Sequence, residues 1–504
     1  MRIRHSSAQE VHLGFHSAEA CKARFGLAGK FNAYYALLFL VLLVILAPIW
    51  IVKYPGMVDY PNHLVRCYML AHYHDNPIWQ QRFVVVHDPI PNLGIELVVM
   101  PLTRLLPLMV CGKVFLSLAA ALYVLGCSAV GRYVTGKPNW LALIAAFTFY
   151  NQTLFMGFAS YVLGIGFFLC AFAFWLRVRD RMTPFHFFLC CLLSIAAFLV
   201  HLTSITLLAV ACFTVAFLDF LRNRKLPGFI VKVAWLACPL LLMVFFMKSS
   251  GRVGHLAWTS PIGKLHGLFQ MFSSYRPMLN LIIGVVLLAC ALVILMRSKI
   301  HLTAVAGLVF LLLFFITPME ILTASYVDKR YIVPGFLLLV LSIEPRWGRW
   351  QKAAVAVALA VMTIRMGAIT ADWLTISRRS EQVLAMGQVL PEGSRIYALV
   401  PDADDTPKFD RGFIHVIQFW TLSRNADIST LFAMSGQQPL VTRHPPCGGP
   451  EWAECFASYD FVWTKVPPPS IREILLGIAT PAVTWEKVTL WRVNRSSLSG
   501  QRAP

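Results

Sequence analysis

Residues 35–52 read YALLFLVLLVILAPIWIV, an unbroken apolar run. An α-helix rises about 1.5 Å per residue, so this run crosses most of the roughly 30 Å hydrocarbon core of a bilayer. It is too long for the core of a signal peptide, and it lacks a small-x-small cleavage motif. We therefore interpret it as an uncleaved first span, preceded by a polar and basic cytoplasmic tail at residues 1–34.

The same apolar pattern recurs along the rest of the chain. Of 504 residues, 58% are hydrophobic and only 13% are charged, which a water-soluble fold of this length cannot bury. About eleven apolar runs are present. They lie near 35–52, 110–130, 140–150, 158–175, 185–200, 204–221, 229–247, 279–296, 302–317, 332–343 and 353–369. The sequence therefore predicts a mainly α-helical, polytopic membrane protein.

We attribute the net charge of +20 to the orientation of the chain in the membrane rather than to a nucleic-acid partner. Basic residues form short clusters in alternate connections between the apolar runs, as the positive-inside rule predicts for cytoplasmic loops. The short connections around Asn151 and His201 carry no Lys or Arg. We therefore expect a multi-pass protein of the inner (plasma) membrane, with its N-terminus in the cytoplasm and its C-terminal segment in the periplasm.

Two larger domains follow the tail in this interpretation. A transmembrane domain covers residues 35–371, with outer loops at 53–109, 248–278 and 319–331, and residues 93–106 in the first loop are expected to form a helix lying at the membrane interface. Residues 372–504 are expected to form a small periplasmic α/β domain that binds or docks. The β-like runs in it are 395–400, 412–417, 459–463 and 483–493.

The same segment contains Cys447 and Cys455, for which we expect a disulfide in an oxidising compartment.

The first outer loop opens with KYPGMVDYPNHLVR at residues 53–66. Asp59, His63 and Arg66 lie here just beyond the first span, and ionisable groups at that position are costly unless they act in chemistry or binding. A structural interpretation is also open. Asp59 is well placed to cap a helix beginning at Pro61, and His63 and Arg66 would then be interfacial polar groups on one face of that helix.

An acidic residue in the first outer loop, ahead of an interfacial helix, is a shared feature of membrane glycosyltransferases of the GT-C class, which this chain resembles. The stretch 58–66 and the later residues Tyr150, Asn151, Gln152, Gly157, Phe158 and Tyr161 are similar to signatures of poorly characterised bacterial members. The resemblance implies transfer of a sugar from a polyprenyl-phosphate carrier to an envelope glycan, lipid or protein acceptor, with inversion at the anomeric carbon.

This chemistry assigns roles to particular residues. Asp59 is the candidate base for the acceptor hydroxyl, and cations at the outer face are expected to stabilise the leaving phosphate. The candidate substrate-binding residues are His63, Arg66, Asp88, Asn151, Tyr161, His201, Arg252, Trp258, Lys329 and Arg330.

Several of these candidates have structural alternatives. Asn151 and His201 are also compatible with helix-turn roles, and Lys329 and Arg330 with binding of lipid headgroups. The role of Arg365, a charge within the last span, stays open.

Metal dependence stays open at this point. Some families of this class use paired carboxylates or a divalent cation such as Mg²⁺ or Mn²⁺, but Val58 precedes Asp59 and no second carboxylate is adjacent to it. Asp88 is the candidate second carboxylate. We predict no metal-ligating residues.

Other functional classes also remain. A transporter or flippase is disfavoured by the few charges within the spans and by the lack of doubled, interrupted helices. A ligase-like enzyme that uses a polyprenyl-diphosphate donor and a noncatalytic envelope assembly protein are the further alternatives.

Overall fold

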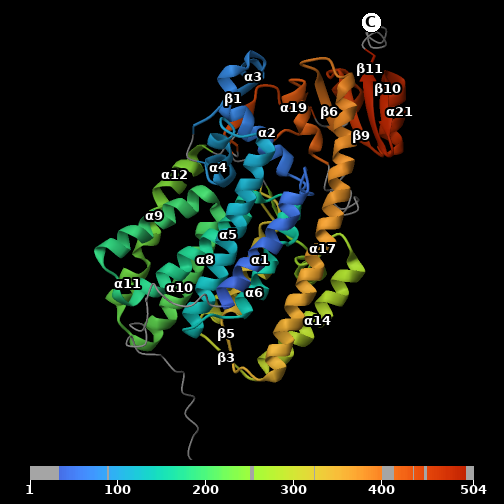
Figure 1. The fold of residues 1–504 in the computed structure, drawn as a ribbon. Coiled ribbons are helices and arrows are strands. Elements are labelled where there is room, and N and C mark those ends of the chain that lie inside the picture. The colour runs from blue at the N-terminus through green and yellow to red at the C-terminus, as the bar shows by residue number, and fades with distance from the viewer. Residues whose placement is uncertain are drawn as a thin grey trace, which may run out of the picture.

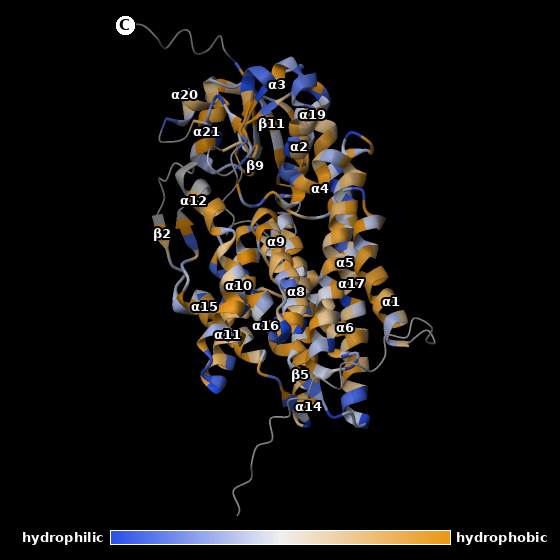
Figure 2. Cartoon of the chain, turned by 90° about the vertical axis from the view of Figure 1, so that its left-hand side faces the viewer, coloured by the Kyte–Doolittle hydropathy of each residue, from blue (hydrophilic) through white to orange (hydrophobic). Residues whose placement is uncertain are grey.

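The computed structural model describes residues 33–87, 90–249, 255–322, 324–399, 414–434, 436, 438–447 and 451–494. A helix lies at each of the eleven predicted apolar runs. Within the described ranges, six helices are long and apolar enough, by length and composition, to cross a membrane. The bundle consists of α1 (Ala33–Ile51), α5 (Leu108–Thr135), α6 (Leu141–Ala146), α8 (Ala159–Val178), α9 (Pro184–Val200), α10 (Leu202–Asn223), α11 (Leu226–Val233), α12 (Leu240–Ser249), α14 (Pro277–Leu295), α15 (Ala304–Ile316), α16 (Ile332–Leu341) and α17 (Arg349–Ala385). Figure 2 shows the bundle as predominantly hydrophobic, with hydrophilic segments gathered toward its two ends.

One predicted span is interrupted. The run at 229–247 divides into α11, the short 3₁₀ helix η5 (Ala234–Ala237) and α12, with a turn at Cys238 and Pro239 between the last two. Proline lacks a backbone N–H and cannot continue the helical hydrogen-bond ladder. The sequence pattern therefore identified the apolar segment but not its break.

Helix α17 joins the bundle to the C-terminal domain. Its 37 residues correspond to about 55 Å of helix, far more than a bilayer core requires. The helix continues through Asp372, where the sequence interpretation placed a domain boundary, and ends at Ala385. Figure 1 shows it rising from the far end of the bundle to the side of the C-terminal sheet.

The first outer loop and the later connections form short elements. They are α2 (Tyr60–Ala71), η2 (Tyr73–Asp75), α3 (Pro77–Arg82), β1 (Phe83–Val85), α4 (Gly94–Leu102), η3 (Phe147–Phe149), α7 (Gln152–Met156), η4 (Arg179–Arg181), β2 (His255–Ala257), α13 (Pro261–Gln270), β3 (Ser298–Ile300), β4 (Glu320–Leu322), η6 (Asp328–Tyr331) and β5 (Ile343–Pro345). Strand β2 pairs with β4, and β3 pairs with β5. Helix α4 is the expected short helix of the first loop and packs on α2, α5 and α8.

The C-terminal domain is built on a five-stranded mixed sheet in the order β10-β11-β9-β6-β7. Its elements are η7 (Met386–Val389), β6 (Arg395–Leu399), η8 (Val416–Phe419), α19 (Trp420–Ser423), β7 (Asp427–Ile428), β8 (Leu440–Thr442), α20 (Trp452–Ala457), β9 (Phe461–Lys465), α21 (Pro469–Ile478), β10 (Ala479–Trp485) and β11 (Val488–Val493). The predicted strand at 412–417 is wrong in its described part, because Val416 and Ile417 begin the 3₁₀ helix η8. Their burial in the domain core overrides the β propensity of branched side chains.

The first outer loop is built into the C-terminal domain. Strands β1 and β8 form an antiparallel ladder between these distant parts of the chain, and Figure 1 shows α2, α3 and β1 at the same end of the molecule as the domain. The side chain of Arg82 donates to the backbone oxygens of Gly393 and Asn425 at 2.6 and 3.3 Å. Trp79 and Phe83 are buried in one apolar cluster with residues of the domain. The loop and the domain therefore form one unit.

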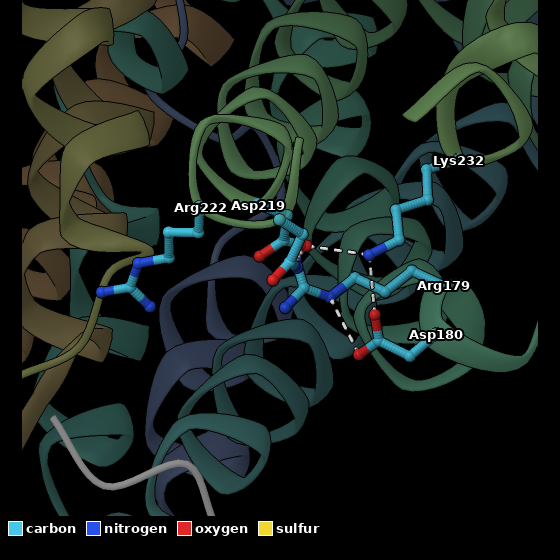
Figure 3. Close-up of a pocket in the computed structure, with 6 residues that line it drawn as sticks. Arg179, Asp180, Asp219, Arg222 and Lys232 are labelled. Atoms are coloured by element: carbon cyan, nitrogen blue, oxygen red, sulfur yellow. Dashed lines mark hydrogen bonds and ion pairs between the residues drawn. The ribbon is translucent and has the colours of Figure 1, made fainter. Parts of the chain in front are cut away.

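A cavity of about 300 Å³ lies where α8, α10 and α11 meet, at the end of α8 away from Ala159 (Figure 3). It is lined by Arg179, Asp180, Asp219, Arg222, Asn223 and Lys232. Asp219 accepts from Lys232 at 2.9 Å and pairs with Arg179 at 3.0 Å, and Asp180 accepts from Lys232 at 2.7 Å. Because cations neutralise both carboxylates, we interpret the cluster as a structural ion-pair network.

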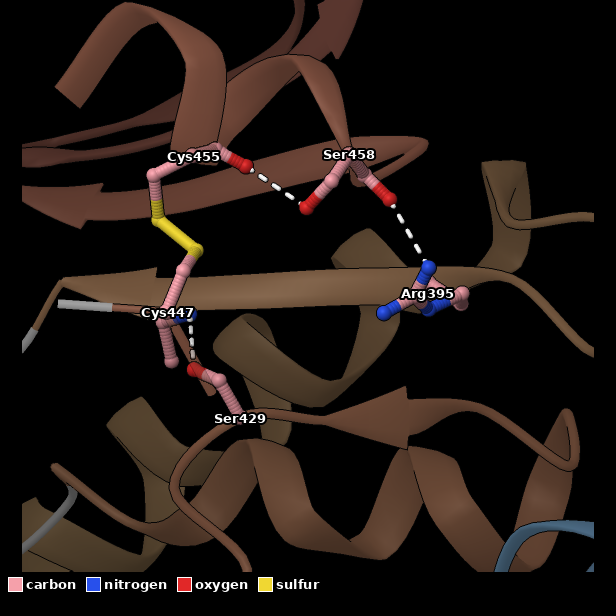
Figure 4. The surroundings of a disulfide bond; sticks show 6 residues. Arg395, Ser429, Cys447, Cys455 and Ser458 are labelled. Atoms are coloured by element: carbon pink, nitrogen blue, oxygen red, sulfur yellow. Dashed lines mark hydrogen bonds between the residues drawn. A yellow bond between two sulfur atoms is a disulfide. The ribbon is translucent and has the colours of Figure 1, made fainter. Parts of the chain in front are cut away.

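The expected disulfide joins Cys447 to Cys455, whose Cα atoms are 5.7 Å apart (Figure 4). Cys455 lies in α20, where the hydroxyl of Ser458 donates to its backbone oxygen at 2.8 Å. Arg395 of β6 donates to the backbone oxygen of Ser458 at 3.0 Å. The disulfide thus joins Cys447 to a helix that is itself tied to the central sheet.

Candidate functional site

Asp59 lies between α1 and α2, and Figure 1 shows α2 at the end of the bundle that carries the C-terminal domain. It occupies the N-cap position of α2, but its side chain makes no capping hydrogen bond. The carboxylate is therefore not used in capping. Its side chain is 17% exposed, so it is enclosed but still accessible.

A second loop holds the backbone of Asp59 in place. The amides of Val58 and Asp59 donate to the backbone oxygens of Phe155 and Met156 at 3.0 and 3.1 Å. Gly157 follows with φ = +92°, and a Cβ there would lie 2.5 Å from the Asp59 nitrogen. Only glycine permits both this left-handed conformation and this close approach.

The neighbouring charges on α2 are paired with α4. The Nε of Arg66 donates to Oε1 of Glu96 at 3.0 Å, and a second Arg66 nitrogen contacts the same oxygen. These side chains are 2% and 6% exposed. Arg66 also donates to Nδ1 of His63 at 3.1 Å. Arg66 is thus a buried ion-pair partner rather than an interfacial polar group.

The C-terminal domain adds a histidine that sequence reasoning missed. Nε2 of His415 lies 3.5 Å from Oδ1 of Asp59, and the two side chains are 12% and 17% exposed. The ring of Phe432 makes edge contacts with both His63 and His415, at 5.4 and 5.7 Å between centroids. Three ionisable side chains from two distant regions therefore converge on one apolar-walled site.

Burial controls the protonation of this group. It raises the pKa of the Asp59 carboxyl from 3.8 to about 7 and lowers the pKa of His415 to about 4. The pKa of His63 lies well below its usual value, because of burial first and then because of the charges of Arg66 and His415. A carboxyl that titrates near neutral pH is suited to accept a proton in catalysis.

Beside Asp59 lies a second polar group formed by Tyr161, His201 and Arg330. The hydroxyl of Tyr161 donates to the backbone oxygen of Arg330 at 2.6 Å, and its ring contacts that of His201. The guanidinium of Arg330 lies 5.4 Å from the ring of Phe158. His201 is within electrostatic reach of both Arg330 and His63. The loop at 155–158 therefore connects this group to Asp59.

Five arginines have a buried nitrogen without a hydrogen-bond partner among the described residues, and four of them also form an ion pair with a carboxylate: Arg66, Arg179, Arg379 and Arg395. The fifth, for which the described residues supply no such ion pair, is Arg330. Its Nη2 donates to the backbone oxygen of Ser325 at 3.2 Å, whereas its Nε is buried without a hydrogen-bond partner in the part of the chain that the structure describes. An unsatisfied buried donor on an arginine is costly in the absence of a ligand. The geometry therefore leaves a donor for an anion at this position.

The other predicted residues have different surroundings. Asn151 is fully buried and caps α7, accepting from the amides of Thr153 and Leu154. His201 caps α10 through Nδ1, which accepts from the amide of Thr203 at 3.0 Å. The helix-turn roles expected as alternatives for Asn151 and His201 are therefore confirmed, and the two turns lie next to the residues of the site.

Lys329 lies in η6, and Trp258 directly follows β2. The ammonium of Lys329 lies 4.8 Å from the ring of Tyr326, and Trp258 is 59% exposed. Asp88 and Arg252 lie outside the described residues. Arg365 is buried and donates to the backbone oxygens of Tyr150 and Phe272, at 2.8 and 3.1 Å, which gives it a structural role.

Among the residues that the structure describes, no group of three or more His, Cys, Asp or Glu side chains has an arrangement suited to a metal ion. The site at Asp59 instead combines one carboxylate with neutral histidines and a paired arginine. It is suited to move a proton and, with Arg330 nearby, to accept an anion.

Comparison with known proteins agrees with this architecture. No family model and no curated protein matches the sequence. Among solved structures, the chain is similar to the crystal structure of ArnT from Cupriavidus metallidurans in the apo state, with a TM-score of 0.52 and 12% sequence identity. The match covers 92% of this chain and 99% of that chain. The chain therefore has the fold of ArnT over nearly its whole length.

Proposed function

We propose that this protein is a membrane glycosyltransferase of the GT-C type, which moves a sugar from a polyprenyl-phosphate carrier to an envelope acceptor on the periplasmic side. The main support for the proposal is the placement of Asp59 at the end of the bundle that bears the C-terminal domain. Its carboxyl is nearly buried and makes no capping hydrogen bond to α2. The fold supports it, because ArnT is a GT-C glycosyltransferase.

In the proposed reaction Asp59 is the base. The acceptor hydroxyl gives its proton to the Asp59 carboxylate while its oxygen forms a bond to the anomeric carbon. The bond from that carbon to the phosphate oxygen breaks, and its electron pair leaves with the polyprenyl phosphate. Attack opposite to the leaving phosphate inverts the anomeric carbon.

Arg330 is proposed to bind the phosphate of the donor. Its Nε, which is buried and has no hydrogen-bond partner among the described residues, supplies a donor, and guanidinium groups suit phosphate oxygens in both charge and geometry. Tyr161 and His201 hold the backbone and the turn beside it. In this proposal Asp59 accepts the proton and Arg330 stabilises the leaving phosphate.

The experiment is glycan analysis of the cell envelope in a strain lacking the gene. The strain is complemented with the wild type, with Asp59→Asn, or with the control Asp75→Asn, which changes a carboxylate in the same loop that is 52% exposed. We expect the wild type and Asp75→Asn to restore one sugar modification and Asp59→Asn to fail at equal protein level. Restoration by Asp59→Asn would support a noncatalytic assembly role instead.

A further inference from the structure

His415 belongs to the C-terminal domain, yet it lies against the carboxylate of the membrane domain. The 3.5 Å separation between its Nε2 and Oδ1 of Asp59 is slightly long for a hydrogen bond. Catalytic hydrogen bonds in unliganded sites are often long and tighten when substrate binds. The separation is therefore compatible with a hydrogen bond between His415 and Asp59 in the substrate complex.

Docking of the domain fixes the position of His415. The side chain of Asn62, fully buried on α2, donates to the backbone oxygen of Thr430 at 3.1 Å and accepts from the amide of Phe432 at 3.0 Å. Phe432 then packs against the rings of both His63 and His415. Together with the ladder between β1 and β8, these contacts hold the histidine beside Asp59.

The two ring nitrogens of His415 have different surroundings. Nδ1 is buried and has no hydrogen-bond partner among the described residues, whereas Nε2 faces the Asp59 carboxylate. We therefore assign the proton of the neutral ring to Nε2, where it meets an acceptor. Because burial lowers the pKa of His415 to about 4, the ring is neutral at pH 7 and acts as a donor without carrying charge.

We infer that His415 is a positioning residue, which donates its Nε2–H to Oδ1 of Asp59 and leaves Oδ2 directed at the acceptor hydroxyl. The C-terminal domain is then part of the transfer site rather than only a binding module. This inference rests on the proposed function, since it assigns Asp59 the role of base.

The donated hydrogen bond favours the ionised carboxylate and so opposes the effect of burial on the pKa of Asp59. The other ionisable groups around the site are His63 and Arg66 on α2, Glu96 on α4, His201 at the start of α10 and Arg330 in η6. All of these remain when His415 is replaced. A change in the titration of Asp59 would therefore report the loss of the His415 donor.

Two substitutions at His415 separate a donor from a packing group. His415→Gln retains an N–H near the position of Nε2 but loses the ring, whereas His415→Phe retains a ring against Phe432 but loses the donor. A donor role predicts that the Gln variant keeps most of its activity and that the Phe variant loses at least tenfold at pH 7. A role in packing alone predicts the reverse order.

The second readout needs no sugar substrate. Dicyclohexylcarbodiimide reacts with protonated carboxyl groups in apolar surroundings, and mass spectrometry of the full-length protein in detergent quantifies its adduct on Asp59 as a function of pH. In the wild type the labelling should fall with a midpoint near pH 7. In His415→Phe the midpoint should rise by about one pH unit, a tenfold change in proton affinity. His415→Gln should stay close to the wild type.

Equal labelling midpoints in the wild type and His415→Phe would overturn the inference, as would an active Phe variant beside an inactive Gln variant. If His415→Phe fails to fold, His415→Asn takes its place, since its shorter amide cannot reach the position of Nε2 and the same rise is expected. Sugar transfer by Asp59→Asn would instead refute the proposed function, while leaving the labelling result and the contact with His415 intact.

Discussion

Gly157 allows a sharp test of how Asp59 is held. Substitution by alanine places a Cβ 2.5 Å from the Asp59 nitrogen and 2.9 Å from its Cα, and both are backbone atoms that cannot rotate away. To restore ordinary contact at 3.4 Å or more, one of the two segments must move by roughly 1 Å, and a misplacement of that size costs about 100-fold in rate. The left-handed φ of +92° adds about 1–2 kcal/mol of strain.

Gly136→Ala is the matched control. Gly136 also has a positive φ, +67°, but a Cβ there would meet nothing within 4 Å. Both variants bear similar backbone strain, whereas only Gly157→Ala displaces Asp59. We expect sugar transfer in isolated membranes, supplied with their own lipid-linked donors, to fall about 100-fold for Gly157→Ala and to remain near the wild-type rate for Gly136→Ala. Equal rates in these two variants, with both proteins folded, would refute the reasoning.

Three further predictions concern protonation and stability. Because burial raises the pKa of Asp59 to about 7, its contribution to stability is present below about pH 4 and is lost as the pH rises through 7. Asp59→Asn should therefore be more stable than the wild type at pH 8, by up to about 4 kcal/mol in the free energy of unfolding, but not at pH 4. Thermal unfolding measures this difference, and no gain in stability at pH 8 would contradict the raised pKa. Arg66→Met should destabilise the fold by about 3–5 kcal/mol, since it leaves Glu96 buried and unpaired, and Arg66→Met/Glu96→Leu should recover most of that loss; additive losses in thermal unfolding would argue against the pair. Reduction of the disulfide between Cys447 and Cys455, which are eight residues apart, should lower stability by about 2–3 kcal/mol, and an unchanged unfolding temperature in dithiothreitol would exclude that contribution.

Much of the bundle could be predicted because its cause is local. A run such as 35–52 must be helical in a bilayer, where every backbone polar group needs an internal partner. The break between α11 and α12 at Pro239 and the passage of α17 beyond Asp372 were not predicted. The break follows from a proline, which the count of apolar residues does not weigh, and the passage of α17 into the C-terminal domain depends on tertiary packing.

The site could be predicted only in part, for a similar reason. Asp59, His63 and Arg66 are close in sequence, and a spacing of three residues brings the last two together on one face of α2. Nothing in the sequence identified Glu96 as the partner of Arg66. His415 lies within the run 412–417, which was predicted to form a strand, and only docking of the C-terminal domain brings it to Asp59.

The most direct test of the central claim is the rate of sugar transfer by the purified protein in proteoliposomes, supplied with polyprenyl-phosphate sugars extracted from its native membranes. Asp59→Asn preserves the size and shape of the side chain and removes the proton acceptor. We predict a loss of about 100- to 10,000-fold relative to the wild type, with normal folding. Transfer by Asp59→Asn at the wild-type rate would contradict the assignment of Asp59 as the base.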